Sequence, residues 1–241
     1  MTQTKNSEAG ILSVIKTICD IRNVSRDVKK NGSKLGLVPT MGALHDGHLS
    51  LVRTMLNQTD QVAVSIFVNP AQFGPDEDLD AYPRQLEQDI ALLKREGVHI
   101  VYCPCVNEMY PEGFSSNIHV GELSDILCGA HRPGHFDGVS TVVAKLLLQV
   151  EPDKAIFCEK DYQQLCVIRR LVKDLNIPCE ILAGEIIRDE YGLALSSRNS
   201  YLNDTELKTA RQMNKVLATV RSLIERGENV PKALDTGWKE L

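Results

Sequence analysis

The feature that most constrains the fold is the alternation of short apolar runs with longer helical patterns. We predict strands at residues 34–38, 61–68, 98–103, 154–158 and 180–187, and helices near residues 47–57, 84–96, 138–149 and 162–175. Residues 62–67 are apolar on both faces, which indicates a sheet that is covered on both sides. The sequence therefore predicts an α/β fold: a Rossmann-like parallel-sheet domain with a small, shortened C-terminal lobe.

The pattern changes after about Arg188, so we predict two domains, residues 1–187 and 188–241. The first thirty residues are expected to form a leading helix. In the second part, residues 195–202 are expected to form a loop, and Asp204 is expected to cap a long helix that runs to about Arg226. The tail after it carries the one tryptophan, Trp238. This part is predicted to be mostly helical.

Composition excludes several classes of protein. With 43% hydrophobic and 24% charged residues the chain should fold, and its net charge of −5 disfavours general nucleic-acid binding. Seven scattered cysteines, an odd number, indicate reduced core residues in a cytoplasmic protein. The first ten residues lack a signal-peptide core, and no window reaches the roughly 18 apolar residues of a membrane span. We expect a cytoplasmic protein with no membrane partner.

A candidate nucleotide motif follows the first predicted strand, where open parallel sheets bind ligands and a helix N-terminus favours anions. Gly42 and Gly47 have the spacing of a P-loop, but His48 follows instead of lysine, so a Walker-type NTPase is rejected. What remains is the HxGH pattern of His45, Gly47 and His48. Two imidazoles there can donate to α-phosphate oxygens, and a glycine lets a nucleotide approach the backbone. The alternative is a helix start with two surface histidines.

A second candidate motif is the run GLALSSRN at residues 192–199, just past the last predicted strand. Ser196 and Ser197 can donate hydrogen bonds to a triphosphate, and Arg198 can neutralise its charge, on a loop that is able to close. Alone, such a string is most often a solvated turn. Its occurrence together with the HxGH motif favours a nucleotide site.

A third candidate motif is FCEKDYQQ at residues 157–164, again between a strand and a helix. Lys160 could hold a phosphate, or could be a solvated surface charge. Asp161 could bind a ribose hydroxyl, or could simply cap the helix. Gln164, one turn further on, could face the same crevice.

Gln72 follows the second predicted strand and is a candidate for hydrogen bonding to a substrate, although it could equally be a turn residue. His131 and His135 are four residues apart, but Pro133 and Gly134 break the helix that would align them, so a zinc site is rejected.

Two further groups carry less chemistry. Cys103 and Cys105 lack the spacing of a redox pair. The acidic run of Asp76, Glu77, Asp78 and Asp80 is usually a solvated loop, although it, or Asp89, could help to hold Mg²⁺.

Four long motifs in this order resemble the pantothenate synthetase (pantoate:beta-alanine ligase) family of the HIGH-motif nucleotidyltransferase superfamily. They are VPTMGALHDGH at residues 38–48, SIFVNPAQF at 65–73, RPGHFDGVST at 132–141 and LSSRN at 195–199. The resemblance runs from about residue 34 to residue 202.

The resemblance implies a cytoplasmic, homodimeric enzyme that uses ATP and Mg²⁺. ATP and pantoate would give pantoyl adenylate and pyrophosphate, and β-alanine would then displace AMP to form pantothenate. Residues 1–187 would bind the nucleotide and pantoate, and residues 188–241 would act as a lid. The partners would be these small molecules, with no nucleic acid and no membrane.

The resemblance also implies residue roles. His48 would be catalytic, Gln72 and Gln164 would bind pantoate, and Gln72 would also lie near β-alanine. The ATP site would consist of Met41, Gly42, Ala43, Leu44, His45, Asp46, Gly47, His48, Cys158, Glu159, Lys160, Asp161, Ile187, Leu195, Ser196, Ser197 and Arg198. The Mg²⁺ ligands stay open.

The physical chemistry agrees with this assignment. A carboxylate that attacks the α-phosphorus is already ionised and needs no base, so the enzyme must mainly align reactants and stabilise charge. We expect His45 and His48 to serve the α-phosphate, and Lys160 and Arg198 to hold the β and γ phosphates. Closure of residues 196–198 would shield the mixed anhydride from water.

Two departures from the family leave alternatives. Cys158 stands where the family has glycine, which would weaken ATP binding. The C-terminal lobe is expected to be about forty residues shorter than is usual in the family, which would weaken closure of the lid. One alternative is another HIGH-type nucleotidyltransferase that makes a nucleotide-linked cofactor. The other is a catalytically silent nucleotide-binding or interaction protein.

Overall fold

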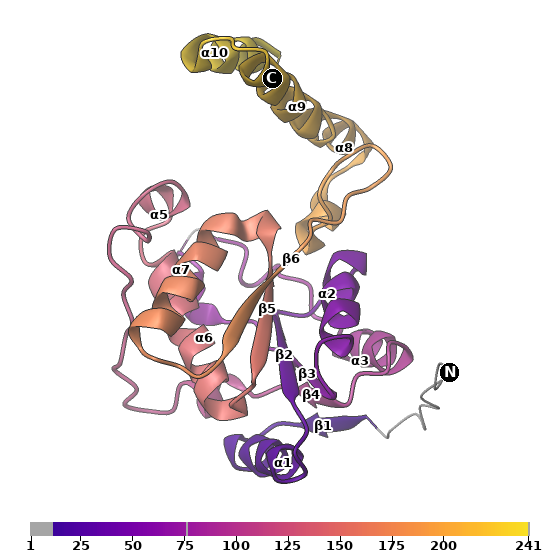
Figure 1. Cartoon of the computed structure of the whole chain (residues 1–241), viewed down its shortest axis with the longest axis vertical. Helices are drawn as coiled ribbons and strands as arrows, with labels where there is room; N and C mark the ends of the chain where they lie inside the picture. The colour runs from indigo at the N-terminus through magenta and orange to yellow at the C-terminus, as the bar shows by residue number, and fades with distance from the viewer. Residues whose placement is uncertain (1–11, 76, 241) are drawn as a thin grey trace. The chain divides into compact units, whose positions relative to one another are not determined.

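The computed structural model describes residues 12–75 and 77–240, which divide into two compact units (Figure 1). Of the described residues, the first unit holds residues 12–44 together with His48–Glu185, and the second holds His45–Gly47 and residues 186–240. No helix in the described part of the chain is both long enough and apolar enough to cross a membrane.

Six strands form one wholly parallel sheet in the first unit, with the order β1-β4-β3-β2-β5-β6. In chain order they are β1 (Ser13–Ile15), β2 (Leu35–Thr40), β3 (Gln61–Ile66), β4 (Ile100–Tyr102), β5 (Lys154–Cys158) and β6 (Glu180–Gly184). The predicted α/β class with a parallel sheet is confirmed.

The α-helices alternate with these strands and then follow them. They are α1 (Ile18–Lys30), α2 (Asp46–Leu56), α3 (Leu86–Arg95), α4 (Val106–Met109), α5 (Cys128–His131), α6 (His135–Val150), α7 (Tyr162–Asp174), α8 (Asp204–Ala210), α9 (Gln212–Glu225) and α10 (Val230–Glu240). Three short 3₁₀ helices are η1 (Pro70–Gln72), η2 (Glu159–Asp161) and η3 (Ser197–Tyr201).

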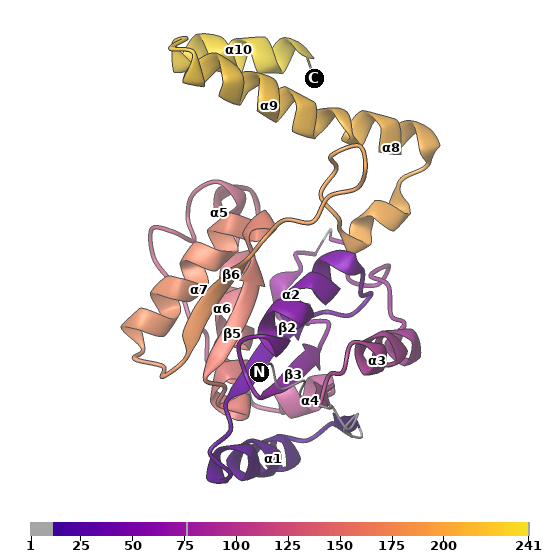
Figure 2. The same ribbon diagram turned by 45° about the vertical axis from the view of Figure 1, so that its right-hand side comes forward.

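Helices cover both faces of the sheet, as Figures 1 and 2 show. Helices α1, α6 and α7 pack on one face, where Leu37 and Ala155 belong to the larger apolar cluster. Helices α2 and α3 pack on the other face, where Val38 and Ile156 belong to a second cluster. Neighbouring residues of one strand thus enter opposite clusters, which is why β2 and β5 read as continuous apolar runs.

The sheet opens between β2 and β5 toward the carboxyl ends of these strands. Their ladder consists of two pairs, Gly36 with Lys154 and Leu37 with Ala155, although β2 continues to Thr40 and β5 to Cys158. Pro39 lies on this stretch and has no N–H to contribute to a ladder. The crossovers from β2 and β5 run in opposite directions along the sheet, so this is the topological switch point, where open α/β sheets bind ligands.

The predicted leading helix is confirmed as α1, but the prediction is wrong for residues 13–15. A short strand, β1, precedes α1 and pairs with β4 at the edge of the sheet. Three residues are too few to show a two-residue periodicity in sequence, so only the tertiary pairing reveals the strand. The part of this prediction that concerns residues 1–11 lies outside the described residues.

The predicted long C-terminal helix is interrupted. Its cap is Asn203, not Asp204: the Asn203 side chain accepts from Thr205 N and Glu206 N, and Glu206 reaches back to Asn203 N in a capping box. The helix then breaks at Arg211, between α8 and α9, and the tail forms a further helix, α10. The predicted loop at residues 195–202 contains the 3₁₀ helix η3.

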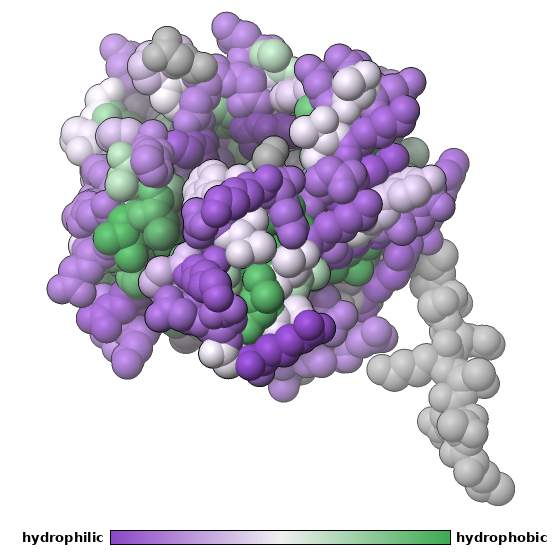
Figure 3. Space-filling model, turned by 90° about the horizontal axis from the view of Figure 1, so that it is seen from above, coloured by the Kyte–Doolittle hydropathy of each residue, from purple (hydrophilic) through white to green (hydrophobic). Residues whose placement is uncertain are grey.

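The second unit carries an exposed apolar stripe. Helices α9 and α10 pack on each other through Val216, Ala233 and Gly237, whose missing side chain leaves room for Val220. Six large apolar side chains of these two helices remain exposed: Met213, Leu217, Ile224, Val230, Leu234 and Trp238. Figure 3 shows apolar patches set in a mostly hydrophilic surface.

The prediction that the cysteines are core residues is wrong for three of the seven. All seven are free thiols, but Cys19, Cys105 and Cys128 are exposed, and only Cys179 is buried. Cys105 and Cys128 stand at the starts of the short helices α4 and α5, within long connections that the strand and helix pattern did not resolve.

Candidate functional site

The loop between β2 and α2 is held by a buried carboxylate. Gly42 and Ala43 both have a positive φ, 83° and 51°, so the chain turns sharply there. The turn exposes two backbone N–H groups, and Asp89 accepts both: Ala43 N donates to Oδ2 at 2.9 Å and Leu44 N to Oδ1 at 2.8 Å. Asp89 is 1% exposed and comes from α3. Its oxygens are therefore occupied by the loop, which argues against the Mg²⁺ role considered for it.

His45 caps the start of α2 with its own side chain. The backbone N–H of Gly47 donates to His45 Nδ1 at 3.1 Å, so Nδ1 accepts and the neutral ring carries its proton on Nε2. A Cβ at Gly47 would lie 2.8 Å from His45 Cε1, so this geometry requires glycine. His48 lies one turn into α2 and is half-buried. The HxGH segment thus presents an imidazole N–H donor where a helix begins.

The third motif follows β5, the neighbour of β2. Asp161 stands at the start of α7, yet its side chain makes no capping bond. Instead, Lys160 Nζ donates to Asp161 Oδ1 at 3.2 Å. The simple capping interpretation of Asp161 is therefore not supported, and both charged residues are exposed.

Cys158 replaces a glycine of the resembled family without backbone strain. Its φ of −75° is ordinary for any L residue. The thiol accepts from Lys160 N at 3.5 Å and donates to Glu185 O at 3.5 Å, so it takes part in the local turn. Burial raises the pKa of the Cys158 thiol, which keeps it protonated and unreactive.

The orientation of the Gln72 amide is fixed by its neighbour Asn69, which is 1% exposed. Asn69 Oδ1 accepts from Ala71 N and from Tyr110 Oη, at 3.3 and 2.7 Å, so the other end of that amide must be the donor. Asn69 Nδ2 donates to Gly138 O and to Gln72 Oε1, both at 3.1 Å.

Because Gln72 Oε1 accepts from Asn69, the donor end of the Gln72 amide faces the other way. Gln72 Nε2 lies 3.4 Å from the thioether sulfur of Met41, a weak acceptor. An amide donor held beside so weak a partner suits a ligand with a strong acceptor, such as a carboxylate or a hydroxyl. The sequence did not predict that Asn69 orients Gln72, because nothing at this position indicates a buried side chain that bonds to distant residues.

Gln164 lies half-buried on α7, and its neighbour Gln163 holds a distant segment. Gln163 Nε2 donates to Leu123 O and Ile126 O at 2.8 and 2.7 Å, and Oε1 accepts from Cys128 N at 3.0 Å. This second structural residue was also missed, because its partners are backbone groups about forty positions away.

A cavity of about 580 Å³ opens at the carboxyl ends of β2, β3 and β4. Its wall includes Met41, Gly42, Phe67 and Asp89, and it is mostly apolar. It adjoins the loop that carries the HxGH motif and provides space for an aliphatic group.

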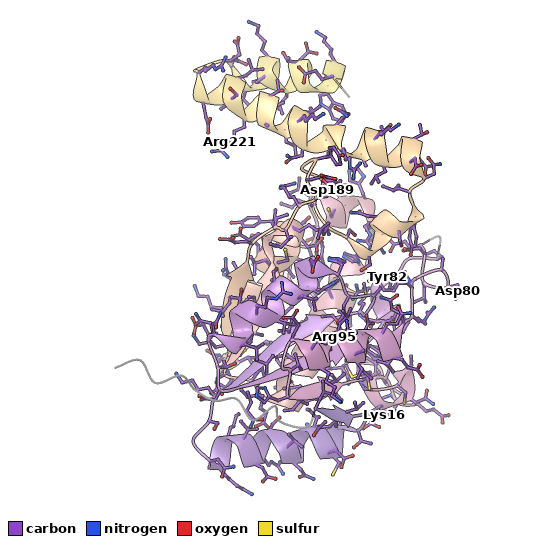
Figure 4. All side chains as sticks on the ribbon, turned by 90° about the vertical axis from the view of Figure 1, so that its right-hand side faces the viewer. Lys16, Asp80, Tyr82, Arg95, Asp189 and Arg221 are labelled. Carbon is purple, nitrogen blue, oxygen red and sulfur yellow. The ribbon has the colours of Figure 1, made fainter. Side chains whose placement is uncertain are left out.

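In the second unit, the turn that precedes the Ser-Ser-Arg motif is organised by Asp189, which Figure 4 labels. Asp189 accepts from Leu193 N at 2.8 Å and from Tyr191 N at 3.0 Å, and pairs with Arg211 at 2.8 Å. The Arg211 guanidinium also stacks on the Tyr191 ring at 3.9 Å. These contacts tie the turn to Arg211, the residue between α8 and α9.

The same unit brings part of the first motif beside the second. Leu195 N donates to Ile187 O at 2.9 Å, and Ser196 Oγ accepts from Arg198 N at 3.3 Å at the start of η3. A Cβ built on Gly47 would lie 3.6 Å from Leu195 Cβ, so these two residues are neighbours.

The structure therefore groups the predicted site residues by unit. The first unit contains Met41, Gly42, Ala43, Leu44, His48, Gln72, Cys158, Glu159, Lys160, Asp161 and Gln164. The second unit contains His45, Asp46, Gly47, Ile187, Leu195, Ser196, Ser197 and Arg198. Within the described residues, no cluster of three or more His, Cys, Asp or Glu side chains suited to a metal ion is found.

Comparison with known proteins gives a consistent family. A family model described as pantoate-beta-alanine ligase matches residues 13–240. The pantothenate synthetase of Thermoanaerobacter sp. (strain X514) is 53% identical over 215 residues, which cover 89% of this chain and 76% of that protein. The pantothenate synthetase of Caldicellulosiruptor saccharolyticus is 51% identical over 228 residues, 95% of this chain and 81% of that protein.

Solved structures agree. The pantoate-beta-alanine ligase (pantothenate synthetase) of Thermus thermophilus has a TM-score of 0.90 at 47% identity and covers 95% of this chain and 81% of its own. The pantoate-beta-alanine ligase of Francisella tularensis, complexed with β,γ-ATP and β-alanine, has a TM-score of 0.83 at 37% identity and covers 95% of this chain and 86% of its own.

Proposed function

The chain belongs to the pantoate-beta-alanine ligase family and is a ligase, and from this premise we propose that it uses ATP to condense pantoate with β-alanine through a pantoyl adenylate. The products would be pantothenate, AMP and pyrophosphate. The Francisella relative in complex with an ATP compound and β-alanine supports the use of both substrates.

One observation carries the proposal. Two candidate phosphate-binding segments and one candidate carboxylate-binding residue directly follow the carboxyl ends of adjacent strands. The HxGH loop follows β2, the Lys160 turn follows β5, and the Gln72 donor follows β3. The sheet opens between β2 and β5 at this edge. A reaction that joins a carboxylate to a nucleotide phosphate needs these groups together.

In the first step, the pantoate carboxylate attacks the α-phosphorus and pyrophosphate leaves. The Gln72 amide donor, with Gln164, would hold pantoate, and the apolar wall of the adjacent cavity suits an aliphatic substrate. The Nε2–H of His45 and the ring of His48 would stabilise negative charge on the α-phosphate. Lys160 and Arg198 would hold the departing phosphates.

In the second step, the β-alanine amine attacks the acyl carbon of the adenylate and AMP leaves. AMP is a good leaving group, so protecting the anhydride from water matters more than acid catalysis. We assign this protection to residues 195–198 of the second unit, the proposed lid.

The described residues do not build a magnesium site of their own. They contain no suitable cluster of three ligating side chains, and Asp89 is occupied by backbone N–H groups. Mg²⁺ usually keeps several waters and binds through substrate phosphates. We therefore derive no step through Mg²⁺. The homodimer and the cytoplasmic location stay predictions.

The decisive assay is exchange of labelled pyrophosphate into ATP. We expect exchange that depends on pantoate and needs no β-alanine, followed by AMP release once β-alanine is added. Exchange without pantoate would favour another HIGH-type nucleotidyltransferase, and the absence of exchange from folded, ATP-binding protein would favour a catalytically silent nucleotide-binding protein.

A further inference from the structure

A continuous line of hydrogen bonds reaches the backbone of Gln72 from three residues that have no role in the proposed reaction. Glu77 and Arg132 form a paired contact, with Arg132 Nε donating to Oε1 at 2.7 Å and Nη2 to Oε2 at 2.6 Å. Arg132 Nη1 lies 3.1 Å from His135 Nε2, and His135 Nδ1 lies 2.9 Å from Gln72 O. The line therefore runs from a carboxylate to the last residue of η1.

The chemistry of the two ends fixes the protonation of His135. A backbone carbonyl only accepts, so Nδ1 must carry a proton. A guanidinium only donates, so Nε2 must be the unprotonated nitrogen. His135 can satisfy both partners only as a neutral ring with its proton on Nδ1.

A protonated His135 would break this line, because two donors, Nε2–H and Arg132 Nη1, would face each other. The charged groups around the ring are Arg132, Glu77 and Asp161. Burial lowers the pKa of His135, the Arg132 cation lowers it further, and the hydrogen bond to Gln72 and the two carboxylates oppose the shift. The net direction is downward, which favours the neutral ring.

The line matters because η1 is short and carries a substrate-binding candidate. Its amide face is set by Asn69, and α6 presses on its other side, since a Cβ at Gly138 would lie 2.2 Å from Ala71 O. The carbonyl of Gln72 ends the helix without an intrahelical partner, so His135 supplies the missing donor. Rotation of this peptide would move the Gln72 amide.

We propose that Glu77, Arg132 and neutral His135 are positioning residues that hold Gln72 for the acyl substrate. The proposal rests on the proposed function, because it assigns Gln72 to pantoate. It also predicts that pantoate binding weakens at low pH, when His135 becomes protonated.

The first test needs no substrate. Nitrogen-15 NMR of the full chain reads the tautomer and the titration of each of the six histidines, and His135→Asn assigns the signal. We expect a proton on Nδ1 and a midpoint below that of an ordinary histidine. An Nε2–H tautomer, or a midpoint at or above the ordinary value, would overturn the proposal.

The second test is the Michaelis constant for pantoate as a function of pH. In the unaltered protein it should rise as the pH falls through the His135 midpoint. His135→Ala should raise it about tenfold, the scale of one lost hydrogen bond. His135→Asn places an amide N–H where Nδ1–H stands, so it should restore the Michaelis constant of the unaltered protein. It should also remove the rise of that constant at low pH, which we call the acid limb.

The third variant, Arg132→Met, removes a cation that disfavours protonation of His135. The acid limb should move up by about one pH unit. Arg170→Met breaks an exposed pair with Asp174 on α7 and serves as the matched control, with no shift. A limb that stays in place in Arg132→Met, or survives in His135→Asn, would show that the residues act only structurally and would overturn the proposal. If the unaltered protein makes no pantothenate, the proposed function fails while the NMR result still decides the state of His135.

Discussion

At the residue scale, internal hydrogen bonds fix the orientation of two side chains of the candidate site. His45 uses Nδ1 to accept from Gly47, which leaves Nε2–H as the donor. Gln72 uses Oε1 to accept from Asn69, which turns Nε2 toward the Met41 thioether. In both residues a local hydrogen bond determines which nitrogen carries the N–H that we propose for binding the anionic substrates.

Replacing His48 or Arg198 by alanine should lower pantoate-dependent pyrophosphate exchange by roughly 10²–10³-fold, the scale of one lost charge-stabilising donor. His131→Ala, at an exposed position outside the proposed site, is the control and should exchange normally. Near-normal exchange in either site variant would remove that residue from the proposed mechanism.

Gly138 lets α6 approach η1, and Gly138→Ala tests that approach. The new methyl group would meet Ala71 O at 2.2 Å and Gln72 Cα at 2.7 Å, so η1 must shift. We expect pantoate turnover to fall about 10²-fold, the scale of a misplacement near 1 Å, with ATP binding retained. Gly121→Ala, whose nearest neighbour would be a side-chain atom at 3.9 Å, is the control. Unchanged kinetics in Gly138→Ala would show that η1 does not position substrate.

At the element scale, the loop between β2 and α2 depends on a third element. Two successive residues with positive φ leave the N–H groups of Ala43 and Leu44 without helical partners, and α3 supplies Asp89 to both. The loop is thus held by a helix residue that lies 45 and 46 positions further along the chain from the two N–H groups. This explains why Asp89 is buried although it is charged: three donors, including Gln85 Nε2 at 3.4 Å, surround its oxygens.

Asp89→Asn keeps the shape of the side chain but replaces one acceptor by an N–H₂ group that faces a backbone N–H. We expect exchange activity to fall at least tenfold, since a buried donor is left without its acceptor. The exposed Glu87→Gln on the same helix should leave activity unchanged. If activity survives in Asp89→Asn, measured alongside the thermal midpoint, the loop does not depend on this carboxylate.

At the scale of the whole molecule, the two units differ in how they bury apolar side chains. The first has two clusters, one on each face of the sheet. The second is built from helices whose mutual contact covers Val216, Ala233 and Gly237 and leaves six large apolar side chains exposed. Trp238 is the most exposed of these, at 75%.

Trp238 is the one tryptophan of the chain, so its fluorescence reports on this surface alone. We expect an emission maximum typical of solvated indole, efficient quenching by acrylamide, and little change on unfolding in urea. Leu234→Ser, which alters the neighbouring turn of α10, should leave the emission unchanged. A blue-shifted, protected signal in native protein would show that Trp238 is covered.

The sequence by itself determined the parallel α/β sheet, the approximate position of five strands and the family, because these depend on local periodicity and on contiguous motifs. Apolar runs and glycine positions are local features of the sequence, so they can be recognised without knowledge of the tertiary structure. The predicted strand at residues 154–158 has the bounds of β5. The grouping of His48, Gln72, Lys160 and Gln164 around one sheet edge also follows once the strands are parallel.

Only the tertiary structure decided which atoms of those residues are engaged. The strand β1 and the roles of Asp89, Asn69 and His135 rest on contacts between segments far apart in sequence. A hydrogen bond between distant residues leaves no periodic trace, and a carboxylate that binds backbone N–H groups looks in sequence like one that binds a metal. The sequence therefore identified the residues of the candidate site, whereas the hydrogen bonds that orient their side chains are set by the tertiary fold.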